Sequence, residues 1–446
     1  MKRLLTILAV ELLTFNFSYA QHAKPIIDKA DYTFLEDMTR AVMDSSRSDP
    51  GQSLPANFGK NSTGGTVIRP GGRNTYPSFW IRDYVMSLES GFVSKAEQKH
   101  MLLLAAASQC NQTWITRGGS MVPFGALPDH IRLDNSLPIY FPGTYSYEGQ
   151  GTKEFGMTPP YDDQFYFIRM VYYYVKSTGD LKMLLKKIKG TPLIDRLEIA
   201  FKVPPSSLDN GIVYTNDAFR GVDFGFRDAE AITGDLCYTS ILKYRAANDL
   251  ALLFERLGNK EKAGNYRDIA QKIKKALPGI FLNTDGMLVA STGESGQPDV
   301  WATAYAVYLD LLAPKDQIKA CQHLADAYKK GLLSYKGNIR HILKGDDFND
   351  QTAWEHSIVP KNRYQNGAYW GTPVGWVAAA IAKVQPRYAR QLVREYIDEL
   401  RADDFRKGSG FGAPFECFYP PDYKRGPVYL TSVSCPYIVF KTLSGN

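Results

Sequence analysis

Pairs of amphipathic segments, each divided by a glycine or proline, recur along most of the sequence and restrict the fold that it can adopt. In the clearest pair, apolar residues recur at helical spacing from Leu242 to Leu257, Gly258 ends the first segment, and Asn259 can cap the second. The spacing predicts two antiparallel helices joined by a tight turn. Further pairs are predicted over 80–107, 165–188, 301–325 and 376–396, and single helices near 31–43 and 431–443.

The two members of a pair differ in polarity. Residues 377–382 (VAAAIA) are apolar all round, whereas the next segment carries Arg387, Arg390, Arg394 and Glu395 on one face. A helix that is apolar on every side must be buried on every side. The pattern therefore predicts buried inner helices ringed by amphipathic outer ones. This is an all-α fold, an (α/α)6 toroid, with long loops and minor β-hairpins at one end.

The first 21 residues have the composition of an export signal. Lys2 and Arg3 are basic, residues 4–13 are largely apolar, and small residues precede a cleavage position after Ala20. We expect a signal peptide ending at residue 20 or 21, a single mature domain over 22–446, and a periplasmic or extracellular protein. No later run of 18 apolar residues occurs, so no membrane span is expected after cleavage.

Charge and histidine spacing argue against several other classes of protein. The chain of 446 residues has 53 basic and 46 acidic side chains, without a run of five Lys or Arg, so we expect no nucleic-acid partner. No CxxC or HExxH motif occurs, and neither a resident metal nor a cofactor is expected. Asp346, Asp347 and Asp350 are compatible with a calcium ion or with solvated loop carboxylates.

The five cysteines are too few and too scattered for a disulfide framework. Cys417 and Cys435 could form one bridge, and buried free thiols are an equally good interpretation.

Long connections rich in glycine, proline, aromatic residues and carboxylates separate the helical pairs. Loops of this length in a compact domain are usually functional, and at one end of a toroid they would build a pocket. Their tyrosines and tryptophans suit stacking against a sugar ring, although they could equally plug the toroid. The connections span 50–78, 117–160, 204–235, 284–298, 333–366 and 403–429.

Two of these loops carry carboxylates suited to the hydrolysis of a glycosidic bond. That reaction needs one carboxylic acid to protonate the leaving oxygen and a second carboxylate to attack or to activate water. Asp223 is flanked by aromatic residues that would raise its pKa, as an acid requires; Asp228 and Asp235 compete with it, and Asp235 is also placed to cap the following helix. Glu416 is the candidate base, or else a structural partner of Arg425.

Four short stretches resemble motifs of the six-hairpin glycosidases, in the same order along the chain. Residues 220–227 (RGVDFGFR) resemble the Ser-Gly-Trp-Asp-Phe-Ser-x-Arg stretch of inverting trehalases and processing α-glucosidases, in which the Asp is the general acid. Residues 79–83 (FWIRD) resemble the Trp-x-Arg-Asp stretch of glucoamylases and debranching glucosidases, whose Arg and Asp hold the terminal sugar. Residues 366–373 (NGAYWGTP) resemble the start of an inner helix, and Glu416 resembles the general base.

The resemblance implies an inverting exo-glycosidase with a blind pocket. Asp223 would protonate the leaving oxygen and Glu416 would activate water roughly 6.5–9.5 Å away. The chain has Arg220 and Val222 where the motif has Ser and Trp, which argues against trehalose as the substrate. The expected substrate-binding residues are Trp80, Arg82, Asp83, Arg220, Arg227, Trp301, Glu355, Tyr369 and Trp370.

Other functions are compatible with the same toroid. A polysaccharide lyase or unsaturated-uronide hydrolase would use a Tyr or His base with an Arg or Asn. A sugar epimerase would use histidines, for which His341 and His356 are the loop candidates. A non-catalytic glycan-binding protein would need the aromatic residues and neither carboxylate. The sequence does not distinguish the sugar, the linkage or the anomer.

Overall fold

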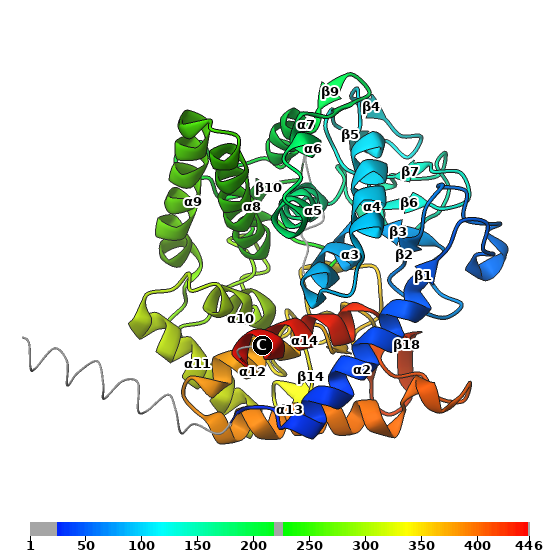
Figure 1. Ribbon diagram of the computed structural model, residues 1–446. Coiled ribbons are helices and arrows are strands. Elements are labelled where there is room, and N and C mark those ends of the chain that lie inside the picture. The colour runs from blue at the N-terminus through cyan, green and yellow to red at the C-terminus, as the bar shows by residue number, and fades with distance from the viewer. Residues whose placement is uncertain (1–24, 218–225, 445–446) are drawn as a thin grey trace, which may run out of the picture.

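The computed structural model describes residues 25–217 and 226–444, which fold mainly into helices joined by long connections (Figure 1). Most helices follow one another as pairs, and the first and last helices of the described chain pack together as a further pair. The pairs are α3 (Ile81–Ser87) and α4 (Lys95–Ser108), α5 (Asp162–Thr178) and α7 (Leu193–Phe201), α8 (Cys237–Arg256) and α9 (Lys260–Phe281), α10 (Val300–Tyr308) and α11 (Pro314–Lys329), α12 (Val374–Ala382) and α13 (Pro386–Ala402), and α14 (Thr431–Leu443) and α2 (Lys29–Ser46).

Among the described residues, six helices contact one another in a closed cycle. Helix α3 contacts α5, α5 contacts α8, α8 contacts α10, α10 contacts α12, α12 contacts α14, and α14 returns to α3. Partner helices pack against this cycle, with α9 on α8, α13 on α12 and α2 on α14. This order of contacts is the one expected for a ring of helical hairpins.

Burial along the helices follows the polarity of the sequence. Helix α12 is buried along nearly its whole length, and α10 is buried at every position from Val300 to Val307. Helix α13 buries only one stripe, which includes Ala389, Leu392 and Tyr396, and turns its charged residues outward. In the pair α12 and α13, the apolar and amphipathic members thus become the inner and the outer helix.

The second helix predicted over 181–188 is the main difference from the expected elements. Helix α6 covers only Lys182–Leu185, and a hairpin of β8 (Lys187–Ile188) and β9 (Thr191–Pro192) follows before α7 begins. Lys189 and Gly190 form the turn with φ of 46° and 84°, a left-handed conformation that suits a tight hairpin and ends a helix.

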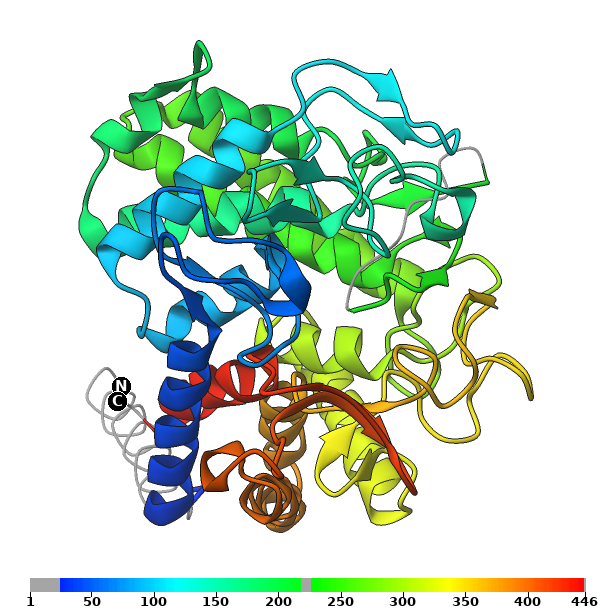
Figure 2. The ribbon, with the colours of Figure 1, turned by 90° about the vertical axis from the view of Figure 1, so that its right-hand side faces the viewer.

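Strands among the connections are more extensive than the minor hairpins expected. A five-stranded antiparallel sheet is ordered β13 (Ser334–Tyr335), β14 (Asn338–Ile339), β16 (Tyr369–Trp370), β17 (Phe415–Tyr419), β18 (Tyr423–Pro427). In Figure 2 the long connections, cyan near 110–160 and yellow near 335–365, lie mainly to the right, and α2 and α4 lie to the left.

The remaining strands form smaller sheets. A three-stranded sheet joins β3 (Ser78–Trp80), β6 (His130–Arg132) and β7 (Pro138–Ile139). Two-stranded pairs join β1 (Arg47–Ser48) to β2 (Val67–Ile68), β4 (Trp114–Ile115) to β5 (Met121–Val122), β10 (Tyr214–Thr215) to β12 (Gly234–Asp235), and β11 (Glu230–Ala231) to β15 (His356–Ser357).

Two local expectations are corrected by these elements. Asp235 does not cap α8, because it pairs with Tyr214 in β12 and the helix follows Leu236 without a side-chain cap. The bridge between Cys417 and Cys435 does not form, since all five cysteines are buried free thiols.

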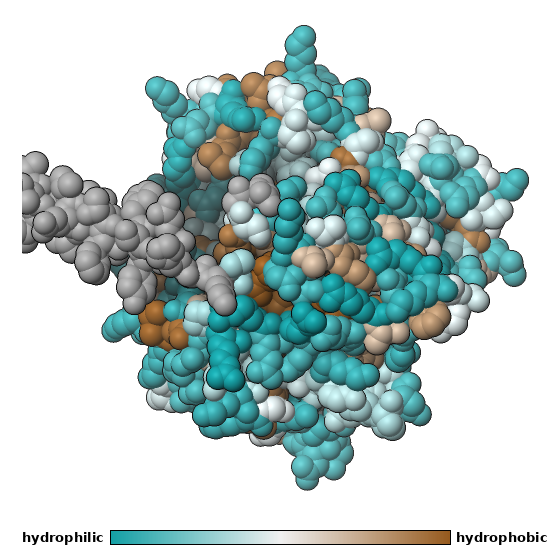
Figure 3. All heavy atoms as spheres, turned by 60° about the horizontal axis from the view of Figure 1, so that its bottom comes forward, coloured by the Kyte–Doolittle hydropathy of each residue, from teal (hydrophilic) through white to brown (hydrophobic). Residues whose placement is uncertain are grey.

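The surface facing the viewer in Figure 3 is mainly hydrophilic, with its hydrophobic residues in small groups. Within residues 25–217 and 226–444, no helix combines the length and the apolar character needed to cross a bilayer. Over the same residues no cluster of three or more His, Cys, Asp or Glu could hold a metal ion. Asp347, one of the calcium candidates, is paired with Arg340 at 3.0 Å and Lys361 at 3.1 Å.

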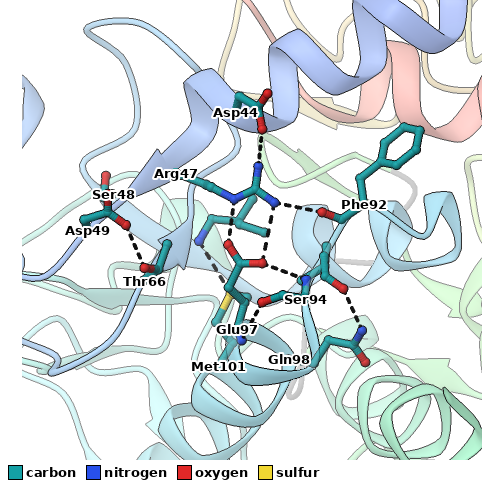
Figure 4. A network of polar contacts seen from close by, with 12 residues as sticks. Asp44, Arg47, Ser48, Asp49, Thr66, Phe92, Ser94, Glu97, Gln98 and Met101 are labelled. Carbon is teal, nitrogen blue, oxygen red and sulfur yellow. Dashed lines mark hydrogen bonds and ion pairs between the residues drawn. The ribbon is translucent and has the colours of Figure 1, made fainter. Parts of the chain in front are cut away.

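Arg47, directly after α2, connects that helix to the start of α4 (Figure 4). Its Nε donates to Glu97 Oε1 at 2.6 Å, its Nη2 donates to the carbonyl of Phe92 at 2.7 Å, and it also pairs with Asp44. Glu97 in turn accepts from the backbone N–H of Ser94 at 2.7 Å, and the Ser94 hydroxyl accepts from the N–H of Glu97 at 3.2 Å. This capping box and ion pair hold α2 and α4 together at their ends.

Replacing Glu97 with Ala is expected to lower the free energy of unfolding by about 1–2 kcal/mol, because the cap of α4 and the partner of Arg47 are lost together. Urea denaturation of the purified protein measures the difference. The control is Glu36→Ala, which removes the exposed pair with Arg40 on α2 and should cost at most about 0.5 kcal/mol. Equal losses in the two variants would contradict the role given to Glu97.

Candidate active site

A cavity of about 280 Å³ lies among the connections, where β3 ends and α3 begins. Segments far apart in the sequence contribute its walls, and aromatic and charged side chains dominate them. The lining includes Tyr76, Trp80, Arg82, Asp83, Asp129, His130, Tyr145, Phe226, Asp228, Tyr364, Glu416, Arg425 and Tyr429.

Glu416 is held by one oxygen on the β17–β18 hairpin. Its Oε2 accepts from the Tyr76 hydroxyl and from Arg425 Nε at 3.1 Å, while Oε1 has no hydrogen-bond partner among the described residues. The side chain is only 1% exposed. Burial raises the pKa of Glu416 above its ordinary value and the charge of Asp228 adds to the effect, whereas Arg425 and Tyr76 oppose it.

Gly426 leaves the space that the Glu416 side chain occupies. It has a left-handed φ of 56°, and a Cβ built there would lie 2.6 Å from Glu416 Cβ and 2.7 Å from Oε2. Both distances are far shorter than a van der Waals contact, so any side chain at position 426 would displace the carboxylate.

Asp228 reaches the same cavity from the turn before β11. Phe226, with φ of 57°, and Asp228 both line the cavity, while Arg227 between them turns into the protein. The amide of Gln365 fixes Asp228, since it donates to Asp228 Oδ1 and accepts from the N–H of Ala229 at 2.7 Å. Burial raises the pKa of Asp228 and the charge of Asp129 reinforces this, against the opposing charge of Arg82.

Asp83 presents a further buried carboxyl group to the cavity. The Tyr429 hydroxyl donates to its Oδ1 at 2.6 Å. Burial raises the pKa of Asp83 to about 7, although Arg82 and the hydrogen bond from Tyr429 favour the ionised form. At neutral pH this carboxyl group can therefore both donate and accept hydrogen bonds.

Arg82 joins the starts of two inner helices. Its Nε donates to Asp162 Oδ2 at 2.7 Å and its Nη2 donates to Asp129 Oδ1 at 3.1 Å. Asp163 lies 3.8 Å from Nη2, and burial together with the charge of Asp162 raises the pKa of Asp163 well above its ordinary value. Asp129 also pairs with His130 Nδ1 at 2.8 Å. A single guanidinium thus balances several buried carboxyl groups, two of which, Asp162 and Asp163, lie in the first turn of α5.

Trp80 is the tryptophan that lines the cavity. His130 stacks on one face of its ring, with centroids 4.4 Å apart and 20° between the planes. Tyr76 and Tyr145 meet it edge-on at 5.2 and 5.9 Å. Trp80 is only partly buried, so it can offer an apolar ring surface to a ligand.

Several residues expected to bind substrate do not line this cavity. Trp301 and Trp370 are fully buried, and Trp301 stacks on His341 with centroids 3.9 Å apart. Both tryptophans pack against Phe226 from behind the cavity wall, with ring centroids 6.0 and 5.4 Å from that of Phe226. They therefore fill the interior of the fold and do not face the cavity. Tyr369 is also fully buried in β16.

Arg227 and Glu355 have structural partners elsewhere. Arg227 Nη1 pairs with Asp299 Oδ2 at 2.6 Å, and Asp299 caps α10. Glu355 accepts from the Thr233 hydroxyl and the N–H of Ser295, both at 3.1 Å. Arg220 and Asp223 lie outside the described residues, so their expected roles stay predictions.

Tyr76, Asp129, Gln365 and Tyr429 belong to the site although no sequence motif singled them out. Each lies in a long connection or immediately before a helix, without a diagnostic spacing around it. The available signal was the density of aromatic and carboxylate residues in loops 50–78 and 117–160, which indicated the region and not the residue.

Comparison with known proteins finds the fold in solved glycosidases. No protein-family model and no curated protein matches the sequence. A wild-type glycosidase superposes with a TM-score of 0.54 over 94% of this chain and 99% of its own, at 12% identity. The GH63 mannosylglycerate hydrolase from Thermus thermophilus, solved in complex with glucose, has a TM-score of 0.55 over 91% of this chain and 99% of its own, at 13% identity. The chain therefore shares the glycosidase fold that the sequence motifs led us to expect.

Replacing Arg82 with Met should lower the free energy of unfolding by about 3–5 kcal/mol, because Asp162 and Asp129 would stay buried without their counter-charge. Urea denaturation at pH 7 measures the loss. Arg117→Met is the control, since Arg117 and its partner Glu148 are both exposed and their separation should change the stability little. A loss for Arg82→Met no larger than that of the control would show that this arginine is not the counter-charge of the site.

Proposed function

We propose that this chain is an exo-acting glycoside hydrolase on an (α/α)6 toroid, which removes a terminal sugar with inversion at the anomeric carbon. The observation that carries the proposal is that two carboxylates from distant segments, Asp228 and Glu416, line one cavity beside Trp80. Glycoside hydrolysis needs such a pair. The glycosidase fold of the solved structures supports the same conclusion.

Glu416 is proposed as the general base. Arg425 and Tyr76 both act on its Oε2 and favour the ionised form, and they leave Oε1 to accept a proton from water. A carboxylate anchored through one oxygen keeps its orientation while the other oxygen does the chemistry. Gly426 makes room for this orientation.

Asp228 is proposed as the general acid that protonates the leaving oxygen. An acid must hold its proton at the working pH, and burial raises the pKa of Asp228 in that direction. Asp223 is the competing acid, favoured by its match to the trehalase-like motif. Separate variants of the two residues decide between them.

The remaining lining suits the recognition of one sugar ring. Asp83 and Arg82 offer charged and hydrogen-bonding groups for hydroxyls, and Trp80 offers an apolar ring surface. A cavity of about 280 Å³ lies at the lower end of the range for small-molecule sites, which favours a single terminal residue over an internal stretch of chain.

A lyase is the second candidate function, and an epimerase is disfavoured. Tyr364 and Arg425 line the cavity with their ring and guanidinium 4.1 Å apart, so a tyrosine base and an arginine for a uronate are both at hand. Unsaturated products from a uronide-containing glycan would favour this alternative. His341 is buried beneath the site and His356 is exposed in β15, and neither lines the cavity.

Glu416→Gln and Asp228→Asn should each lower kcat for release of a terminal sugar by about 10²–10⁴-fold, because the base or the acid is lost. A panel of aryl glycosides and oligosaccharides is assayed for released reducing sugar. The product anomer, followed by proton NMR during turnover, is expected to be the opposite of the substrate anomer.

Glu148→Gln is the matched control for that experiment, since Glu148 is an exposed loop carboxylate outside the cavity and should keep kcat within about twofold. Unchanged rates in both Glu416→Gln and Asp228→Asn would refute the mechanism. A loss of rate in Asp223→Asn with none in Asp228→Asn would move the acid to Asp223 and leave Glu416 as the base.

Tyr76→Phe is expected to shift the acidic limb of the kcat/KM profile to higher pH. The Tyr76 hydroxyl stabilises ionised Glu416, so its removal raises the pKa of the base, which must lose its proton before it can act. Tyr145→Phe is the control, since Tyr145 also lines the cavity and its hydroxyl makes no hydrogen bond within the described residues. An equal shift in both variants, or a shift to lower pH, would contradict the assignment.

A further inference from the structure

A second cavity, of about 620 Å³, is lined by residues of α7, α8 and α9 and of the connection that follows α7. Figure 1 shows where these helices lie. It shares no lining residue with the candidate active site. Apolar groups make up much of its wall, including Phe201, Pro204, Pro205 and Ile269. Leu208 at its edge has a side chain that is 95% exposed, which is unusual for leucine and places an apolar group where it could cover a bound molecule.

Lys243 lines this cavity from α8 without a counter-charge. The residue is only 6% exposed, yet among residues 25–217 and 226–444 its ammonium group has neither a hydrogen bond nor an ion pair. Its Nζ lies 5.2 Å from the centroid of the Phe201 ring. Burial alone lowers the pKa of Lys243 to about 8. The ammonium group has little contact with solvent and no protein partner among the described residues, so a ligand that supplied an anion would gain a charge-assisted interaction that no described protein group already makes.

The other charges around the cavity do not neutralise Lys243. Glu198 is its acidic lining residue, and both Glu198 oxygens are engaged, by Lys262 Nζ at 2.5 Å and by the Tyr266 hydroxyl at 3.1 Å. Lys202 and Lys272 are exposed at the edge and add positive charge. The cavity therefore favours an anion, and its one deep cation matches a single negative charge.

Two of the three aromatic rings of the wall, those of Tyr266 and Phe201, are engaged by neighbouring rings. Tyr266 lies flat against Phe254, with centroids 5.7 Å apart and 2° between the planes. Phe201 meets the edge of Tyr266 at 5.3 Å and carries Lys243 near its ring. The wall thus offers apolar packing around one cation, which suits a hydrophobic acid better than an acidic glycan.

We propose that this cavity binds a small molecule with one carboxylate and an apolar body, the carboxylate pairing with the Lys243 ammonium group and the body lying against Phe201, the two prolines and Ile269. The contact would be a charge-assisted hydrogen bond in surroundings of low polarity, where such bonds are strongest. The site is independent of the proposed hydrolase activity.

Isothermal titration calorimetry with 4-phenylbutyrate and its neutral amide, 4-phenylbutanamide, tests the proposal on the unmodified protein. The two probes share an apolar body and differ in the charge of the head group. The acid is expected to bind about tenfold more tightly than the amide, or better, because only the acid can pair with Lys243. Equal binding of the two probes, or no binding of the acid, would overturn the proposal.

Two variants locate the site. Lys243→Met keeps the length and the apolar stem, and it should weaken binding of the acid about tenfold or more while leaving the amide unchanged. Lys272→Met removes an exposed lysine of the same cavity and should change the affinity by no more than about twofold. Equal effects of the two variants would mean that general surface charge attracts the acid. Glu416→Gln should bind 4-phenylbutyrate as the unmodified protein does, which separates this site from the hydrolase proposal.

Discussion

The inner helices contact one another in a closed cycle and are covered by partner helices, so little of their surface faces solvent, and this constraint limits where charged groups can lie. Helices α10 and α12 meet this constraint because they have almost no polar side chains. Where α3 and α5 begin, the carboxylates of Asp83, Asp162 and Asp163 gather instead, at helix N-termini that favour negative charge. Arg82 balances them. The candidate active site lies beside the start of α3, where this charged cluster gathers.

The proposed acid and base are supported in different ways. Glu416 belongs to a regular hairpin, in which the neighbouring strand supplies Arg425 as its partner. Asp228 belongs to a turn and depends on the side chain of Gln365, which comes from a connection more than a hundred residues later. A rigid base beside an acid held by a single amide is compatible with a reaction in which the acid must release and recover a proton.

Local periodicity was sufficient to predict most helices and their pairing. The predicted segment 431–443 coincides with α14, and Asn259 caps α9 as expected. Prediction failed at 181–188, where the apolar spacing is helical but the left-handed turn at Lys189 and Gly190 forms a hairpin. The roles of the tryptophans were harder to predict, because the same residue type lines the cavity at position 80 and packs in the buried core at position 301. The composition of a loop does not show which of its side chains face the cavity and which are buried. The tertiary contacts decide this.

The absence of a β-carbon at Gly426 is part of the geometry of the candidate active site. Its hydrogen stands where any other residue would place a β-carbon against the Glu416 side chain. Natural variation at these two positions should therefore be coupled. A relative that keeps the glutamate at 416 should also keep the glycine at 426. A relative that has lost the glycine should no longer hold the carboxylate in this orientation, even if the glutamate is present. In comparing distant relatives, the pair is a more discriminating marker of retained chemistry than the glutamate alone.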